Sequence, residues 1–172
     1  MASILVTGGS GFVGQHLIQR LIQERHEITS LNRTNLDLAK YNPAETALTK
    51  DKDVLIHLAS FVNINDMLKN PQETIANNIN STLNLLEDIR LNNPSCILIF
   101  LSSEKVYGNA AGNLNTNTFD TNGINIDEEH PTIPVDPYGS SKLASELLIK
   151  TYHSNYSLIK FCNPRDSTRC AA

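Results

Sequence analysis

Val6-Thr7-Gly8-Gly9-Ser10-Gly11-Phe12-Val13-Gly14 joins a short apolar run to an amphipathic segment. A glycine-rich turn between a strand and a helix binds the pyrophosphate of a dinucleotide, because backbone N–H groups point outward at the helix N-terminus. Gly8 permits the tight turn, Gly11 lets the backbone approach the phosphates, and Gly14 lets helix and strand pack closely. The segment therefore predicts a cofactor loop at the start of an α/β fold.

Apolar runs alternate with amphipathic segments along the rest of the chain. The runs are mostly continuous, which is typical of strands buried on both faces of a parallel sheet, and they lie at 4–6, 28–31, 54–58, 97–101 and 158–161. Helical spacing of apolar residues occurs at 12–24, 71–91 and 138–152. This alternation predicts a Rossmann-type, doubly wound parallel sheet in a three-layer α/β/α arrangement, truncated after about the sixth strand.

Size and charge limit the possible functions. The chain has 172 residues, enough for one domain with a hydrophobic core, and a formal net charge of −4. We expect no nucleic-acid or membrane partner, since there is no basic footprint, no room for a secretory leader before the first strand, and no bilayer-length apolar run. The cysteines lack the paired spacing of a zinc or redox site. A reduced, cytoplasmic protein without a metal is the expectation.

The adenosine half of a dinucleotide should lie at the end of the second strand, where Asn32 and Arg33 stand. An acidic residue usually holds the ribose hydroxyls at this position, and none is present. Arg33 could pair with a 2′-phosphate through its planar guanidinium, or it could be a solvated loop arginine. The sequence therefore slightly favours NADP over NAD. Asp37 is placed to meet the adenine amine.

A tyrosine and a lysine lie four residues apart in Tyr138-Gly139-Ser140-Ser141-Lys142, on one face of a predicted helix. A phenol has an ordinary pKa of about 10, so Tyr138 needs a nearby positive charge to act as a base, and Lys142 can supply it. Ser102 and Ser103 close a predicted apolar strand, and Ser103 taken alone is better interpreted as a capping serine at the strand end. Together with the glycine loop and this serine pair, the tyrosine and the lysine predict a site of proton transfer.

Further segments follow the glycine loop in order: His57-Leu58-Ala59-Ser60, Asn78 within Asn-Ile-Asn-Ser-Thr, Ser102 to Gly108, Pro137 to Lys142, and Lys160-Phe161-Cys162-Asn163-Pro164. With them, residues 3–164 resemble the extended short-chain dehydrogenase/reductases, the NAD(P)-dependent nucleotide-sugar epimerases and dehydratases. The last segment is similar to Arg-Tyr-Phe-Asn-Pro of UDP-galactose 4-epimerases, whose asparagine contacts the substrate diphosphate.

The resemblance implies a role for each matching residue. Tyr138 would be the base, Lys142 would lower its pKa and hold the nicotinamide ribose, and Ser103 would steady the reacting oxygen. The cofactor would contact Gly8, Gly11, Phe12, Val13, Gly14, Asn32, Arg33, Asp37, Leu58, Ala59, Ser60, Asn78, Tyr138 and Lys142. The substrate would contact Ser103, Glu104 and Asn163.

Two of these segments keep simpler interpretations open. Asn78 has a structural role at the active site in the family, but the sequence fits a surface asparagine equally well. His57 lies inside a predicted buried strand, which favours a packed core histidine over a catalyst.

The residues after Ser103 bear on the reaction. Sugar 4,6-dehydratases of this family carry an Asp-Glu pair there as acid and base, whereas this chain has Glu104 and Lys105. A lysine replaces a carboxylate base only with a strongly shifted pKa. Reductase-epimerases of the GDP-fucose type have a cysteine at the Glu104 position. We therefore expect a nucleotide-sugar epimerase or keto-sugar reductase that uses Tyr138-assisted hydride transfer at a sugar hydroxyl carbon.

Family members are longer, and their second half builds the lobe that grips the nucleotide sugar. We expect an NAD(P)-binding Rossmann domain at 1–164, a long Asn-rich surface loop at 108–137, an irregular tail at 165–172, and no substrate domain. The alternative to an enzyme is a truncated, non-catalytic dinucleotide-binding remnant or sensor module. By resemblance, the helices at 71–91 and 138–152 would form a homodimer interface.

Overall fold

A single parallel sheet organises the protein. The structure, a computed structural model, describes residues 1–61, 64–108, 126–156 and 161–162. Within these residues the five strands follow the spatial order β2-β1-β3-β4-β5. They are β1 Ser3–Thr7, β2 Glu27–Leu31, β3 Val54–His57, β4 Ile97–Phe100 and β5 Phe161–Cys162. The chain moves from β1 to β2 on one side and continues with β3 on the other, which is the order of a doubly wound sheet.

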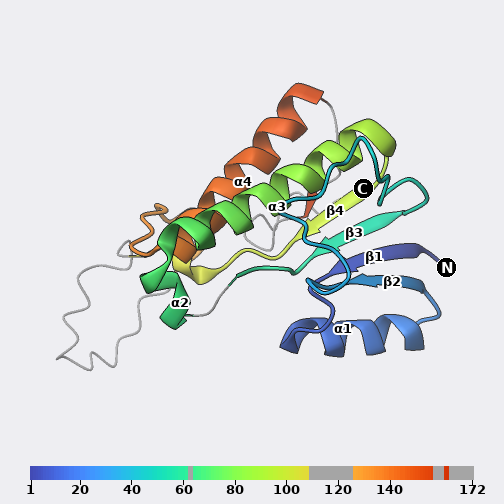
Figure 1. Cartoon of the computed structure of the whole chain (residues 1–172), viewed down its shortest axis with the longest axis horizontal. Helices are drawn as coiled ribbons and strands as arrows, with labels where there is room; N and C mark the ends of the chain where they lie inside the picture. Colours follow the sequence, from blue (N-terminus) through green and yellow to red (C-terminus); the bar gives the residue numbers. More distant parts are fainter. Residues whose placement is uncertain (62–63, 109–125, 157–160, 163–172) are drawn as a thin grey trace.

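The helices cover both faces of this sheet (Figure 1). α1 Phe12–Gln23 lies on one face, and α3 Pro71–Asn92 and α4 Pro137–Tyr156 lie side by side on the other. The short α2 Ile64–Lys69 precedes α3, and a 3₁₀ turn, η1 Glu104–Val106, follows β4. The predicted three-layer α/β/α arrangement is confirmed.

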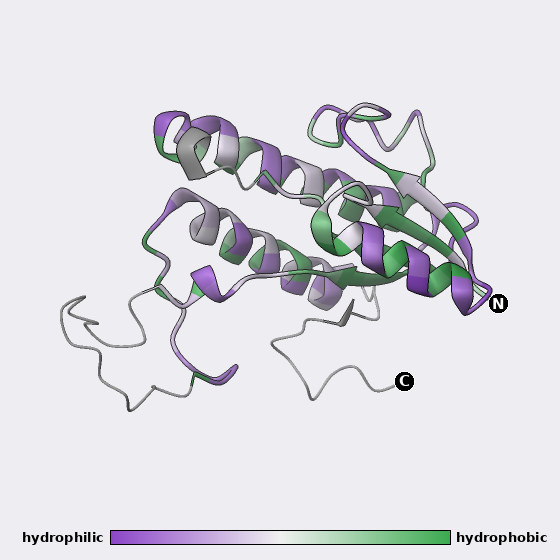
Figure 2. Cartoon of the chain, turned by 90° about the horizontal axis from the view of Figure 1, so that it is seen from below, coloured by the Kyte–Doolittle hydropathy of each residue, from purple (hydrophilic) through white to green (hydrophobic). Residues whose placement is uncertain are grey.

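Alternation along β1 creates an apolar cluster on each face of the sheet. On the α1 face, Ile4 and Val6 pack with Ile56, Leu17, Ile18 and Leu21. On the other face, Leu5 packs with Leu55, Leu85, Leu86, Ile89 and Ile149. Figure 2 shows the strands as mainly hydrophobic and the helices as striped, which is the pattern of amphipathic helices on a buried sheet.

The start of α4 is fixed by the residues that precede Tyr138. Pro137 occupies the first helical position, where its missing N–H costs nothing. The Asp136 Oδ1 accepts a hydrogen bond of 2.7 Å from the Gly139 N–H, as an N-cap side chain does. Tyr138 is therefore held in the first turn of the helix, with Lys142 one turn further on.

The predicted helices and the first four strands are confirmed, with ends that differ by a few residues. Of the predicted strand at 158–161, only residue 161 lies within the described residues. The sheet was expected to end after about the sixth strand, and five strands lie within the described residues. Between β2 and β3 the chain forms turns, and Asp88 of α3 accepts hydrogen bonds from the N–H groups of Leu48 and Thr49 there at 3.0 and 2.9 Å.

Some predicted features fall outside the described residues. They are residues 109–125 of the Asn-rich loop, Asn163, and the tail at 165–172. None of the helices in the described ranges is long and apolar enough to cross a membrane.

Candidate active site

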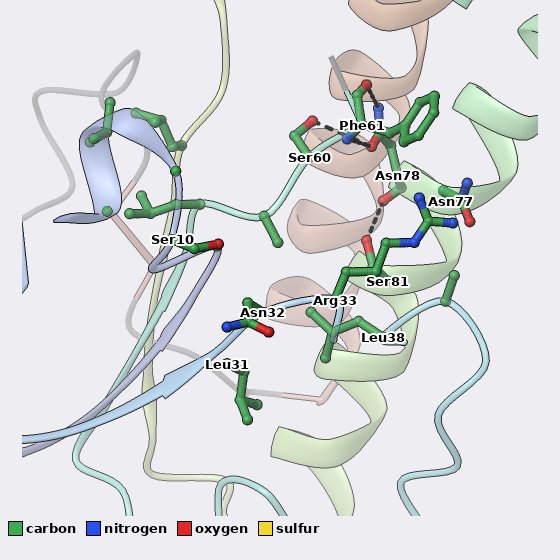
Figure 3. Close-up of a pocket in the computed structure, with 18 of the residues that line it drawn as sticks. Ser10, Leu31, Asn32, Arg33, Leu38, Ser60, Phe61, Asn77, Asn78 and Ser81 are labelled. Carbon is green, nitrogen blue, oxygen red and sulfur yellow. Dashed lines mark hydrogen bonds between the residues drawn. The ribbon is translucent and has the colours of Figure 1, made fainter. Parts of the chain in front are cut away.

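A pocket of about 420 Å³ lies at the carboxyl ends of the strands, where Gly8 follows β1 and Leu58 follows β3. This is the point at which the strand order reverses and where ligands bind in such sheets. Figure 3 shows Asn32, Arg33, Ser60 and Asn78 around this pocket. All the residues expected to contact the cofactor line it, namely Gly8, Gly11, Phe12, Val13, Gly14, Asn32, Arg33, Asp37, Leu58, Ala59, Ser60, Asn78, Tyr138 and Lys142. The structure brings them together, and their contacts with a cofactor stay predictions.

Backbone packs directly on backbone in the glycine loop. Gly8 has a φ of +73°, and a Cβ there would lie 2.6 Å from the Ala59 nitrogen. A Cβ at Gly14 would lie 2.4 Å from the Gly8 carbonyl oxygen. The N-cap of α1 is Gly11, and no side chain caps this helix. Its first N–H groups therefore remain available for an anion, which fits the phosphates of a dinucleotide.

Arg33 lines the pocket at the carboxyl end of β2 (Figure 3). Its guanidinium is 3.8 Å from the Glu73 carboxylate and 5.5 Å from the centre of the Phe61 ring. Both charged side chains are more than half exposed, so their ion pair contributes little to stability. Asp37 lines the same end and lies 3.6 Å from Lys40.

Asn78 connects the loop after β3 to α4. Its Oδ1 accepts hydrogen bonds from the Phe61 N–H at 2.7 Å and the Ser60 hydroxyl at 3.3 Å. Its Nδ2 donates to the Ser141 hydroxyl at 2.9 Å. Only 5% of Asn78 is exposed, so the surface interpretation is wrong. The side chain is part of the buried frame of the pocket.

Tyr138 is partly buried beside Ser103. Burial raises the pKa of its phenol, hydrogen bonds with Ser103 and Ser60 lower it, and the charges of Glu104 and Asp136 raise it; the net direction is upward. The sequence predicted a pKa lowered by Lys142. The result is opposite because the Lys142 ammonium lies 5.8 Å from the centre of the Tyr138 ring, where it does not outweigh desolvation.

Lys142 is almost completely buried, with 3% of its surface exposed. Its Nζ donates a 2.9 Å hydrogen bond to the Leu101 carbonyl and lies 4.7 Å from the centre of the Phe100 ring. Burial lowers the pKa of the ammonium from 10.5 to about 8, against the opposing charge of Glu146. Lys142 therefore carries its charge at neutral pH and loses it as the pH rises past about 8.

Ser103 and Glu104 lie next to the pocket but not in its lining. The Ser103 hydroxyl donates to the Glu104 carboxylate at 3.0 Å and accepts from the Lys105 N–H at 3.2 Å. Ser103 therefore caps η1 and also contacts the phenol of Tyr138. The third predicted substrate contact, Asn163, lies outside the described residues.

Several pocket residues were not predicted. They are Ser10, Leu31, Leu36, Leu38, Ala39, Phe61, Asn77, Ser81, Leu101 and Ser102. Proximity in sequence was an available signal for those that directly adjoin predicted site residues, namely Ser10, Leu31, Leu36, Leu38, Phe61, Asn77 and Ser102. It is a weaker signal for Ala39, Ser81 and Leu101, which lie two or three positions from such a residue.

His57 is a packed core histidine, as predicted. It is 1% exposed, and its ring is hydrogen-bonded to Thr7 at 2.7 Å and to Thr82 at 3.3 Å. Burial, and to a smaller extent the charge of Lys142, lowers its pKa from 6.5 to about 3. The ring is therefore neutral at physiological pH.

This low pKa predicts an acid-sensitive fold. Below pH 6.5 the unfolded chain takes up a proton that the folded chain does not bind until about pH 3, so stability falls as pH decreases through this window. Between pH 7 and 4.5 we expect protonation of His57 in the unfolded chain to lower the free energy of unfolding by about 2 to 3 kcal/mol. Urea unfolding at the two pH values should show a smaller decrease in this free energy for His57→Gln than for the wild type. The exposed His16→Gln serves as the control, and equal losses in both variants would contradict the prediction.

Comparisons with known proteins show relatives in sequence and solved structures with a similar fold. A putative UDP-glucose 4-epimerase of Methanocaldococcus jannaschii is 30% identical over 93% of this chain and 55% of its own length. A solved UDP-N-acetylglucosamine 4-epimerase from Methanobrevibacter ruminantium, in complex with UDP-N-acetylmuramic acid, has a TM-score of 0.74 and 26% identity over 99% of this chain and 59% of its own. RMD from Pseudomonas aeruginosa, in a structure complexed with NADPH, has a TM-score of 0.73 and 28% identity, and the match covers 94% of this chain and 51% of that one.

The chain thus spans about half the length of the relatives it matches. The sheet of this half has the order of a doubly wound fold, and residues of the glycine loop line one pocket together with Tyr138 and Lys142 of α4. Residues 4–170 match the model of one family, and with this match the chain belongs to the NAD dependent epimerase/dehydratase family.

Proposed function

We propose that this chain binds NAD or NADP in the pocket and acts on a nucleotide sugar, as an epimerase or keto-sugar reductase. The observation that carries the proposal is that Tyr138 and Lys142 line the same pocket as the uncapped glycine loop. The family match supports nucleotide-sugar chemistry. The specific sugar and nucleotide are not part of the proposal.

Each of the three polar residues has a separate task in this proposal. Tyr138 removes the proton of a sugar hydroxyl, Ser103 hydrogen-bonds the same oxygen, and Lys142 holds the nicotinamide ribose. A bound dinucleotide supplies a hydride acceptor for the carbon that bears this hydroxyl, and its oxidised ring brings a positive charge that favours the phenolate. The raised pKa of Tyr138 makes such an additional charge necessary for a base at neutral pH.

The proposal has a direct test. Calorimetric titration with NAD and NADP measures cofactor binding, and incubation with UDP-sugars plus either dinucleotide measures conversion. Binding together with conversion supports an enzyme. Binding without conversion supports the alternative, a dinucleotide-binding module. Absence of binding would refute both.

We propose that the pocket slightly prefers NADP over NAD, because Arg33 would contact the 2′-phosphate. Replacing Arg33 with alanine should weaken NADP binding about tenfold, since a charge-assisted contact with the 2′-phosphate is lost, and should leave NAD binding unchanged. Glu73 competes for the same guanidinium at 3.8 Å. The variant Glu73→Gln should therefore strengthen NADP binding. Unchanged NADP affinity in Arg33→Ala would refute the 2′-phosphate role.

We also propose a homodimer, by the resemblance stated above, through the outer surfaces of α3 and α4. Exposed apolar side chains are present on both helices, including Leu91 and Leu147 at 46% and 56%. Light scattering over a range of concentrations measures the oligomeric state, and a monomer at all of them would contradict the proposal.

A further inference from the structure

α4 holds the end of β4 through two consecutive contacts. The Lys142 ammonium donates to the carbonyl of Leu101 at 2.9 Å, and the carboxylate of Glu146 accepts a hydrogen bond from the hydroxyl of the next residue, Ser102. Lys142 and Glu146 are four residues apart and so share one face of the helix. The segment they hold leads directly into Ser103.

The carboxylate of Glu146 is completely buried, with 0% of the residue exposed. Burial of a carboxylate is costly unless a charge or several hydrogen bonds compensate it. The hydroxyl of Ser102 donates one hydrogen bond to this carboxylate. The ammonium of Lys142, itself 3% exposed, is the opposite charge one helical turn away.

Within the part of the chain that the structure describes, the other groups next to Lys142 do not provide a negative charge at neutral pH. His57 on β3 is neutral, and the phenol of Tyr138 on α4 is protonated. β4 contributes the Phe100 ring and the Leu101 carbonyl, and the charge of Glu104 on η1 acts on Tyr138. The charge of Glu146 opposes the effect of desolvation and raises the pKa of Lys142.

We propose that Glu146 is a positioning residue of the candidate active site: it keeps Lys142 charged and fixes Ser102, and thereby Ser103, against α4. This inference rests on the roles proposed above for Ser103, Tyr138 and Lys142. Glu146 does not touch substrate or cofactor in this scheme. It acts through the lysine on its own helix and the serine at the end of β4.

Two substitutions separate the charge from the hydrogen bond. Glu146→Gln keeps an oxygen that can accept from Ser102 but removes the charge, whereas Ser102→Ala removes the hydrogen bond and keeps the charge. The exposed Glu45, which bonds to Asn42 on the surface, provides the control Glu45→Gln. The pKa of Lys142 is read from NMR spectra of the ¹³C-lysine-labelled chain, with its signal assigned by Lys142→Met.

We expect the pKa of Lys142 to fall by about one unit in Glu146→Gln, because an opposite charge no longer supports the ammonium. Ser102→Ala and Glu45→Gln should leave the pKa of Lys142 at its wild-type value, and Glu146→Asp, which keeps the charge, should leave it close to that value. An unchanged Lys142 pKa in folded Glu146→Gln would overturn the proposal. The titration needs no cofactor, so it remains readable even if the wild-type chain binds no dinucleotide and the proposed function fails.

A second readout covers the case in which Glu146→Gln does not fold alone. Removal of the lysine in the double variant Glu146→Gln/Lys142→Met should then restore folding, since no buried cation is left without its partner. Failure to restore folding would mean that Glu146 acts independently of Lys142 and would overturn the proposal. In the folded case, the alkaline limb of the pH profile of dinucleotide affinity should move to lower pH in Glu146→Gln. If Glu146→Gln lowered dinucleotide affinity equally at every pH, Glu146 would have a merely structural role, and the proposal would also be overturned.

Discussion

Replacement of Gly8 by alanine is expected to destabilise the protein by about 3 kcal/mol or more and to weaken dinucleotide binding about a hundredfold. The reason is twofold: its φ of +73° disfavours any side chain, and the new Cβ would lie 2.6 Å from the Ala59 nitrogen. The clash is with backbone, so neither side can rotate away. Urea unfolding measures the first effect and calorimetric titration the second.

Gly11→Ala provides the matched control in the same loop. Gly11 has a φ of −74°, and the nearest atom to its added Cβ is the Gly8 carbonyl oxygen at 3.2 Å. We expect a stability loss within about 1 kcal/mol. Binding should still weaken, because the new methyl group stands where phosphates would approach the backbone. Wild-type stability in Gly8→Ala, or equal destabilisation in both variants, would contradict this account.

The second large effect is expected on turnover. If Tyr138 is the base, Tyr138→Phe should slow conversion of a UDP-sugar about 100- to 10,000-fold and leave dinucleotide affinity close to wild type. The substitution removes one hydroxyl and preserves the ring that lines the pocket. Single-turnover reduction of the dinucleotide, followed by its absorbance, gives the rate without interference from product release.

Tyr41→Phe is the control for this experiment. The Tyr41 hydroxyl donates to the Thr46 carbonyl at 3.0 Å and is not part of the pocket lining. Its loss should affect stability slightly and turnover not at all. A Tyr138→Phe protein that converts the sugar at the wild-type rate would exclude Tyr138 as the base.

The regular elements were predictable because their cause is local. Apolar runs without alternation indicated the buried parallel strands, and Pro71 and the residues around Gly14 marked helix starts. The turns between β2 and β3 were not predictable in this way. Their backbone is held by Asp88, which lies about 40 residues further along in α3, and such contacts leave no periodic signal.

The site shows the same division. Residues in motifs, such as Gly8, Tyr138 and Lys142, meet in one pocket as the motif order indicated. The electrostatic balance was not accessible from spacing. Tyr138 and Lys142 stand at i and i+4, but the rotation that brings the ammonium to Leu101, and the degree of burial that raises the phenol pKa, depend on tertiary packing.

The strand order also determines how the protein reaches its native state. β1 pairs with β2 at Ile4 and Ile28 and with β3 at Ile4 and Val54, and β4 pairs with β5 at Leu98 and Phe161. Every pair of neighbouring strands is distant along the chain, so the entropy cost of closing a long loop precedes the favourable contacts between the strands. Folding should therefore be slow for a protein of this size. During synthesis β1 is made before either of its partners, and its β3 side stays unpaired until β3 has been made. The nascent chain should therefore depend on chaperone protection of this apolar strand.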